Sequence, residues 1–159
     1  MTTLHLADAD ATAALGAALA RTLPARAVVH LRGDLGAGKT TLARGLLREL
    51  GVQGAVRSPT YTLVECYPTA AGEVLHLDLY RIADAAELAF LGVDEAAERA
   101  RLILVEWPER GGAGLPAADL ELRMRIAGRG RDVELVAASA SGAAWQAALP
   151  APAPDTGPS

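Results

Sequence analysis

Hydrophobic positions in the first third of the chain follow two different spacings. Between residues 10 and 22 apolar side chains recur at helical intervals, and Pro24 ends that pattern. Residues 27–32 form a short apolar run, which predicts a strand. Residues 42–50 return to helical intervals, and Gly51 follows as a helix stop. The spacing therefore predicts a helix, a strand and a second helix in that order.

The rest of the chain combines strand patterns with short helical ones. Leu75, Leu77 and Leu79 alternate with polar residues, which is typical of a strand. Residues 102–105 are continuously apolar, which is typical of a strand buried on both faces. We expect strands at 61–67, 73–80, 102–105, 119–127 and 132–137, with the first two and the last two forming hairpins, and short helices at 84–90, 94–100 and 141–149.

A glycine-rich segment connects the first predicted strand to the second helix. Residues 33–40 read Gly-Asp-Leu-Gly-Ala-Gly-Lys-Thr and fit the phosphate-binding pattern G-x-x-x-x-G-K-[ST] at every fixed position. In such a loop, backbone N–H groups and the helix N-terminus bind phosphate, the lysine contacts the β- and γ-phosphates, and the hydroxyl ligates Mg²⁺. The sequence predicts a nucleoside triphosphate site formed by Gly33, Asp34, Leu35, Gly36, Ala37, Gly38, Lys39, Thr40 and Thr41.

Lys39 is the one lysine of the chain. Lys and Arg together number 15, so subtracting this lysine leaves 14 arginines. A compact ammonium suits phosphates as a point charge, whereas arginine supplies positive charge everywhere else.

The loop and its neighbours predict the fold class. An α/β, P-loop NTPase-like domain of three layers accommodates the βαβ elements together with the two hairpins. We expect a mixed central sheet, parallel near the loop and antiparallel towards the edges. The length of 159 residues favours one domain, at 1–149, and residues 150–159 read as a disordered Pro/Ala-rich tail.

Two acidic residues are candidates for the carboxylate that a P-loop site needs for its metal. Glu106 directly follows the buried strand at 102–105, which should lie beside the loop strand, so the pattern favours Glu106. Asp78 ends an alternating strand and is expected either in the active site or as a solvated or capping carboxylate.

Three further features have both a functional and an ordinary interpretation. Thr60, after Ser58 and Pro59, is a switch residue for γ-phosphate or a polar loop residue. Trp107 flanks the nucleotide or covers the edge of the core. The arginines between 123 and 131 contact nucleotide, RNA or a partner, or form a solvated face.

Composition removes several classes of function. The net charge of −4 and the 4% aromatic content disfavour a nucleic-acid-coating protein. The single cysteine, Cys66, leaves no Cys cluster for zinc and is expected to be buried. His5, His30 and His76 show no metal-binding spacing and are expected to be structural. No apolar run reaches the roughly 18 residues of a membrane span, and the N-terminus lacks signal-peptide features, so a cytoplasmic location is expected.

Four segments occur in an informative order: the phosphate loop, Ser58–Glu65, His76–Arg81 and Glu106–Pro108. With them the chain resembles the bacterial ATPase family of tRNA threonylcarbamoyladenosine biosynthesis, called TsaE and formerly YjeE. The resemblance covers roughly residues 4–149.

The resemblance implies roles for individual residues. Lys39 would bind phosphate, and Thr40 and Glu106 would bind Mg²⁺. Asp78 would be needed for activity. The resemblance also carries over the family's tryptophan, its switch-like Ser-Pro-Thr block and the arginine of a late Gly-Arg pair, which map to Trp107, Ser58 to Thr60 and Arg129, although Gly130-Arg131 is a second such pair.

The resemblance also implies an activity and partners. The protein would be a Mg²⁺-dependent ATPase, weak alone, that resets the threonylcarbamoyl transferase complex between turnovers. The expected partners are the transferase subunit TsaD and its paralogue TsaB, with tRNA involved indirectly and no membrane. The modified tRNAs would be those that read codons beginning with A.

Two other P-loop classes compete with this interpretation. A small-molecule kinase suits the length and the loop, but residues 111–116 carry no arginine for a lid. A GTP-dependent switch would need a second lysine in its guanine-selecting block, and Lys39 is already committed to phosphate.

Overall fold

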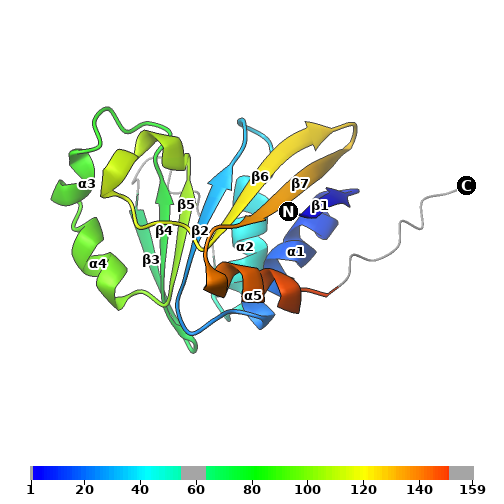
Figure 1. Ribbon diagram of the computed structural model, residues 1–159, viewed down its shortest axis with the longest axis horizontal. Coiled ribbons are helices and arrows are strands. Elements are labelled where there is room, and N and C mark those ends of the chain that lie inside the picture. The colour runs from blue at the N-terminus through cyan, green and yellow to red at the C-terminus, as the bar shows by residue number, and fades with distance from the viewer. Residues whose placement is uncertain (1, 55–63, 151–159) are drawn as a thin grey trace, which may run out of the picture.

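A computed structural model describes residues 2–54 and 64–150 and places seven strands in one sheet, in the order β1-β7-β6-β2-β5-β4-β3 (Figure 1). In chain order the elements are β1 (Thr2–Leu6), α1 (Ala9–Arg21), β2 (Ala27–Arg32), α2 (Lys39–Glu49), β3 (Val64–Thr69), β4 (Gly72–Asp78), α3 (Glu87–Phe90), α4 (Val93–Arg99), β5 (Leu102–Glu106), two 3₁₀ turns (Pro108–Arg110 and Gly112–Gly114), β6 (Leu120–Ala127), β7 (Gly130–Ala137) and α5 (Ala140–Ala148).

The centre of the sheet is parallel and its edges are antiparallel. β2 runs parallel to both β5 and β6, and β4 runs parallel to β5. The hairpins β3–β4 and β6–β7 are antiparallel, as is the pairing of β1 with β7. The predicted α/β fold with a mixed sheet is confirmed, and so is the expectation that the strand at 102–105 lies beside the loop strand.

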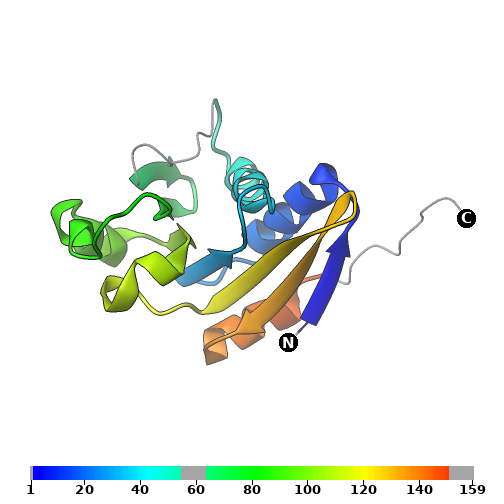
Figure 2. The same cartoon turned by 90° about the horizontal axis from the view of Figure 1, so that it is seen from above.

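Helices pack on both faces of the sheet. Alternate residues of β5 show this, because Leu102 and Leu104 join one hydrophobic cluster whereas Ile103 and Val105 join another. The first cluster contains residues of α1 and α2, which run side by side in Figure 2. The second contains residues of α3 and α4. The sheet is therefore covered on its two faces by different helices, which gives three layers.

Glycines bring α1 and α2 into close contact. A Cβ atom at Gly16 would overlap the backbone carbonyl oxygen of Leu42, and one at Gly45 would overlap that of Ala13. The two helices therefore touch backbone to backbone, and the helix that follows the phosphate loop is held firmly against its neighbour.

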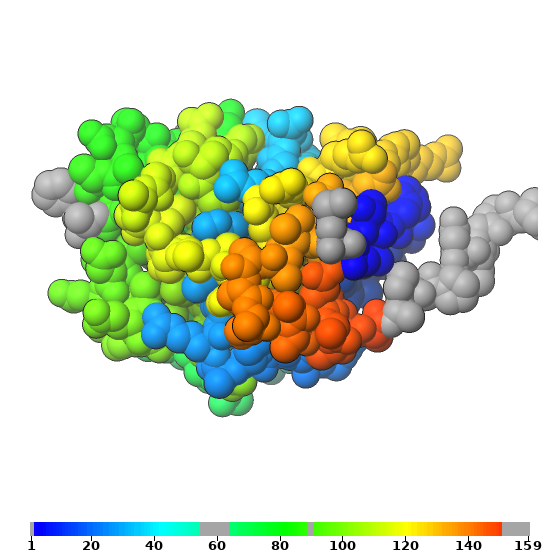
Figure 3. All heavy atoms as spheres, viewed as in Figure 1, coloured from blue at the N-terminus to red at the C-terminus, as the bar shows by residue number. Residues whose placement is uncertain are grey.

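The two ends of the described chain adjoin one another. β1 pairs with β7, and the side chain of Gln146 in α5 donates a hydrogen bond of 2.7 Å to the Thr2 hydroxyl. The space-filling view in Figure 3 shows the orange C-terminal elements against the dark blue N-terminal strand. Trp145 is fully buried in the same cluster as α1 and donates its indole N–H to the carbonyl of Leu19 at 3.3 Å.

Most predicted elements occur within a few residues of their expected bounds, but two expectations were wrong. The N-terminal strand β1 was not predicted. Cys66 lies exposed on the edge strand β3, not in the core. The tail expected at 150–159 lies, apart from Pro150, outside the described residues. No helix in the described part of the chain is both long enough and apolar enough to cross a membrane.

Candidate nucleotide-binding site

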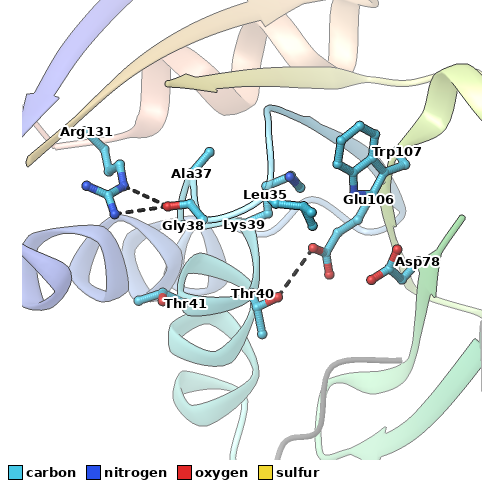
Figure 4. Close-up of a pocket in the computed structure, with 11 residues that line it drawn as sticks. Leu35, Ala37, Gly38, Lys39, Thr40, Thr41, Asp78, Glu106, Trp107 and Arg131 are labelled. Carbon is cyan, nitrogen blue, oxygen red and sulfur yellow. Dashed lines mark hydrogen bonds between the residues drawn. The ribbon is translucent and has the colours of Figure 1, made fainter. Parts of the chain in front are cut away.

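A pocket opens where β2, β4 and β5 end and α2 begins (Figure 4). Three parallel strands bring distant segments together here, because the register aligns the end of β5 with the ends of β2 and β4. The residues that line the pocket come from the phosphate loop with the start of α2 and from three other places in the chain. They are Leu35, Gly36, Ala37, Gly38, Lys39, Thr40, Thr41, Asp78, Glu106, Trp107 and Arg131.

The backbone of the phosphate loop favours glycine at three positions, since Gly36, with φ 82°, joins Gly33 and Gly38 in having a positive φ. Gly33 has φ 150° and lies so close to the backbone carbonyl of Met124 that a side chain would collide with it. Gly38 has φ 101°, in the left-handed region, and directly precedes α2. No side chain caps the amino end of α2. Its first N–H groups are therefore available to an anionic ligand at the pocket.

Lys39 is the buried cation of this pocket. Its side chain is 5% exposed, and its ammonium donates hydrogen bonds to the backbone carbonyls of Gly33 and, at 3.0 Å, Asp34. Gly33 and Asp34 therefore contact Lys39 without lining the pocket themselves. The ammonium also lies 4.5 Å from the ring centroid of Trp107, a cation–π distance.

Burial lowers the pKa of Lys39 from its ordinary value, and the nearby carboxylates of Glu106 and Asp78 oppose that shift. The two carboxylates therefore offset only part of the free-energy cost of burying the charged ammonium. A phosphate placed in the pocket would supply that charge.

Glu106 and Thr40 face each other across the pocket. Glu106 is 2% exposed at the end of β5, and its Oε1 accepts a hydrogen bond from the Thr40 hydroxyl at 3.4 Å. Asp78 ends β4 directly beside Glu106 in the parallel register and is 4% exposed. The buried position of Asp78 favours the active-site interpretation over that of a solvated carboxylate, although Asp78 also accepts a bond from its own chain, from the Tyr80 N–H at 3.0 Å.

The oxygens of Thr40, Glu106 and Asp78 suit a magnesium ion shared with a phosphate ligand better than a metal ion whose ligands all come from the protein. Among the described residues, no cluster of three or more His, Cys, Asp or Glu could enclose a metal. Mg²⁺ typically keeps several waters and binds one or two protein oxygens together with the phosphates of a substrate. Thr40 and Glu106 would hold the ion, and Asp78 lines the same pocket.

Trp107 forms one wall of the pocket in an uncommon backbone conformation. Its φ of 58° and ψ of 49° make it the one non-glycine residue with a positive φ in the described ranges. Such conformations cost about 1–3 kcal/mol and concentrate at functional sites. The ring of Tyr80 lies 4.9 Å from that of Trp107, and the Arg110 guanidinium lies over both rings, at 5.2 and 5.6 Å.

An arginine from the β6–β7 hairpin reaches the loop, and it is Arg131. Its guanidinium donates two hydrogen bonds to the carbonyl of Gly36, at 3.2 and 3.0 Å, and it lines the pocket. Arg129, the residue expected from the Gly-Arg pattern, is exposed in the hairpin turn and is not among the lining residues. The geometry therefore favours the second Gly-Arg pair over the first.

Two residues of the predicted or possible site need separate mention. Thr60, with Ser58, lies outside the described residues, so its switch role stays a prediction. His76, expected to be an ordinary structural residue, is fully buried, and its Nε2 lies 2.7 Å from Glu106 Oε2. Two sequence signals could have pointed to it: its position two residues before Asp78 on a strand, and its place at the start of the His76–Arg81 segment.

The arginine stripe on β6 is paired with acidic residues. Arg123 contacts Glu134 at 3.5 Å, and Arg125 contacts Asp132 at 3.0 Å. Arg32 on the neighbouring strand bonds to Glu121. These ion pairs offset the charge of Arg123 and Arg125, and for these two arginines they favour the interpretation of a solvated face over that of an RNA-binding surface.

A glycine-rich loop between a parallel strand and a helix, with a buried lysine and carboxylates on the adjacent strands, defines a P-loop protein of the α/β class. A family model described as "Threonylcarbamoyl adenosine biosynthesis protein TsaE" matches residues 6–133. The chain therefore belongs to the TsaE family. This membership decides against the two alternative P-loop classes, the small-molecule kinase and the GTP-dependent switch.

Individual relatives agree with the family match. A tRNA threonylcarbamoyladenosine biosynthesis protein TsaE of Haemophilus influenzae is 48% identical over 110 residues, which cover 69% of this chain and 70% of the relative. The TsaE protein of Bacillus subtilis is 39% identical over 101 residues, covering 64% of this chain and 63% of the relative. The crystal structure of Bacillus subtilis YdiB superposes with a TM-score of 0.78 at 26% identity, covering 92% of this chain and 91% of that one.

Proposed function

We propose that this protein binds and hydrolyses Mg²⁺-ATP in support of threonylcarbamoyladenosine formation in tRNA. The observation that carries the proposal is the pocket in which the phosphate loop, Lys39 and Thr40 face Glu106 and Asp78. Membership of the TsaE family gives that chemistry its setting, because relatives bear the name of this biosynthesis.

The residues of the pocket divide the work of phosphoryl transfer. The amides of the loop and of the α2 N-terminus bind the phosphate oxygens, and Lys39 turns from the loop carbonyls to the β- and γ-phosphates. Thr40 and Glu106 would hold a magnesium ion, whose charge would stabilise negative charge that develops on the phosphates. Asp78 would orient a water in the pocket, either the attacking one or one bound to the metal, and Trp107 and Arg131 line the pocket on either side of the loop.

The carbonyl contacts of Lys39 support a slow reaction by the isolated protein. The ammonium is already bonded to Gly33 and Asp34, so a triphosphate has to exchange those bonds for its own. A partner that reorganises the loop would remove that barrier. We propose that the transferase subunit TsaD and its paralogue TsaB are these partners, and that hydrolysis resets their complex between rounds of transfer to tRNAs that read codons beginning with A.

Reconstitution tests this function. TsaD, TsaB, substrates and tRNA are combined with the wild-type chain or with Lys39→Ala, and modified tRNA per complex is counted. The variant should give no more than about one round, because losing the phosphate cation costs a few kcal/mol at the transition state. Arg44→Ala, on the exposed side of α2, is the matched control and should turn over like the wild type. Repeated rounds with Lys39→Ala would refute the resetting role.

A further inference from the structure

A histidine occupies a position on β4 where the surroundings are apolar. His76 alternates with Val74 and Asp78 on one face of the strand, and that face turns towards the cluster that contains α2. Its side chain has no exposed surface. Burying an imidazole costs free energy unless both ring nitrogens are hydrogen-bonded. The presence of a histidine at this buried position therefore needs an explanation.

The bond that His76 makes ends on the carboxylate of Glu106. Nε2 of His76 lies 2.7 Å from Oε2, while Oε1 of the same carboxylate accepts the hydroxyl of Thr40 at 3.4 Å. The two oxygens of Glu106 are therefore bonded to two different elements, Oε2 to β4 and Oε1 to the start of α2.

The direction of this bond follows from the carboxylate. An ionised Glu106 can only accept, so Nε2 carries the proton and donates. Nδ1 has no hydrogen-bond partner among the described residues. In the described part of the chain, Nδ1 is therefore buried without a partner while Nε2 keeps its bond. Burying an unpaired nitrogen costs free energy, and an apolar side chain at this position would avoid that cost.

We infer that His76 is a positioning residue for the metal-binding carboxylate. Its N–H fixes Oε2 of Glu106 in the interior, which turns Oε1 towards Thr40 and the cation that the two residues would share. His76 does not line the pocket, so it acts through Glu106 and does not touch the ligand. This inference rests on the proposed function.

The same bond restricts Glu106 to one orientation before any ligand arrives. A free glutamate side chain would have to lose rotamer entropy when the metal binds, and a preorganised one has already lost it. Bonds from such outer residues to metal ligands commonly change metal affinity by about 10- to 100-fold when they are removed.

Binding measurements separate this role from a purely structural one. Calorimetry with the β,γ-imido analogue of ATP is run in EDTA and in MgCl₂, and the ratio of the two affinities measures the metal-dependent part. In His76→Leu that ratio should fall about tenfold, while affinity in EDTA changes little because the phosphate loop is intact. His76→Gln, whose amide can donate in place of Nε2, should recover most of the ratio.

The chain offers a matched control in His30, which lies on β2, separated from β4 by β5, and bonds to the carbonyl of Pro116 at 3.1 Å. His30→Gln should leave the ratio unchanged. In a Glu106→Gln background, His76→Leu should cause no additional loss, since the carboxylate through which it acts is already absent.

Several results would overturn the inference. They are an unchanged ratio in His76→Leu, equal losses in EDTA and in MgCl₂, and a failure of His76→Gln to recover the ratio. If His76→Leu does not fold, His76→Asn replaces it, because the shorter amide cannot reach Glu106; equal ratios in the Asn and Gln variants would then reject the inference. A wild-type chain that does not bind the analogue would instead reject the proposed function.

Discussion

The protein's own atoms enclose the ammonium of Lys39. Two loop carbonyls and the face of Trp107 surround it, and 5% of the residue remains exposed. The loop is thus shaped for phosphate while its cation is engaged elsewhere. Under the proposed function, the affinity for a triphosphate would depend on how much more favourably the ammonium interacts with phosphate oxygens than with these carbonyls.

Arg131 and Arg129 provide a comparison at the scale of single residues. Arg131→Ala removes two hydrogen bonds to Gly36 and one cation from the pocket, so it should weaken ATP binding by about tenfold. Arg129→Ala removes an exposed side chain in the same hairpin and should weaken binding less. Titration calorimetry with Mg²⁺-ATP measures both. A larger loss for Arg129→Ala would show that the hairpin moves when nucleotide binds.

The residues that sequence alone could place are those defined by local spacing. Lys39 and Thr40 belong to one contiguous motif, and Glu106 directly follows a recognisable buried strand. Arg131 and His76 could not be placed in the same way. Their roles depend on how a hairpin folds back on the loop and on which strand pairs with β5, and neither fact is encoded within a few residues.

At the scale of elements, the close contact of α1 with α2 predicts that a glycine-to-alanine substitution will lower the free energy of unfolding, the opposite of its usual effect in a helix. Replacing glycine by alanine inside a helix normally stabilises it by about 0.5–1 kcal/mol. Gly45→Ala should instead destabilise the protein by about 1–3 kcal/mol, because the new methyl group collides with the backbone of Ala13.

Urea unfolding of Gly45→Ala and of a control variant, Arg44→Ala, tests this prediction. Arg44→Ala, at the exposed position before Gly45, should change the free energy of unfolding by less than about 0.5 kcal/mol. An increase in stability for Gly45→Ala would mean that the helices separate at no cost, and that their close approach is not needed to hold α2.

Elements defined by strong periodicity were the easiest to predict. β2, α2 and β5 occur close to the expected bounds because their apolar patterns are long or continuous. β1 was missed because residues 2–6 are short and half polar, and the strand exists through its long-range pairing with β7. The exposure of Cys66 follows from the place of β3 at the sheet edge, which spacing along the chain does not reveal.

For the whole molecule, two titrating groups make stability fall as the pH falls. Burial lowers the pKa of His30 from its ordinary 6.5, although the bond to the Pro116 carbonyl opposes the shift. The bond from His5 lowers the pKa of Asp132 from its ordinary 3.8, with help from Arg125. Both groups bind fewer protons in the folded state than in the unfolded chain, so both favour folding at neutral pH.

The His30 contribution should be complete above pH 6.5 and should be lost as the pH falls through the lower folded-state pKa. His30→Gln removes this group, so its free energy of unfolding should decline less between pH 7 and pH 5 than that of the wild type. Urea titrations at several pH values measure the two slopes. Equal slopes would show that His30 does not titrate differently in the two states.

The architecture of the whole chain was largely predictable because a phosphate loop between strand and helix implies parallel strands beside it, and hairpins imply antiparallel edges. The neutral character of the β6 face was not predictable. Arg123 and Arg125 look like a cationic stripe in the sequence, and only the register of β6 with β7 reveals their partners Glu134 and Asp132.

The single exposed thiol of Cys66 gives experimenters one chemical handle. Cys66 pairs with Leu75 on β4, three positions before Asp78, so a fluorophore coupled there would stand about 10 Å along the strand direction from the pocket. Burial raises the pKa of the thiol, so coupling will proceed faster in mildly alkaline buffer. One maleimide reaction, with no prior mutagenesis, would yield a probe of ligand arrival in the native chain.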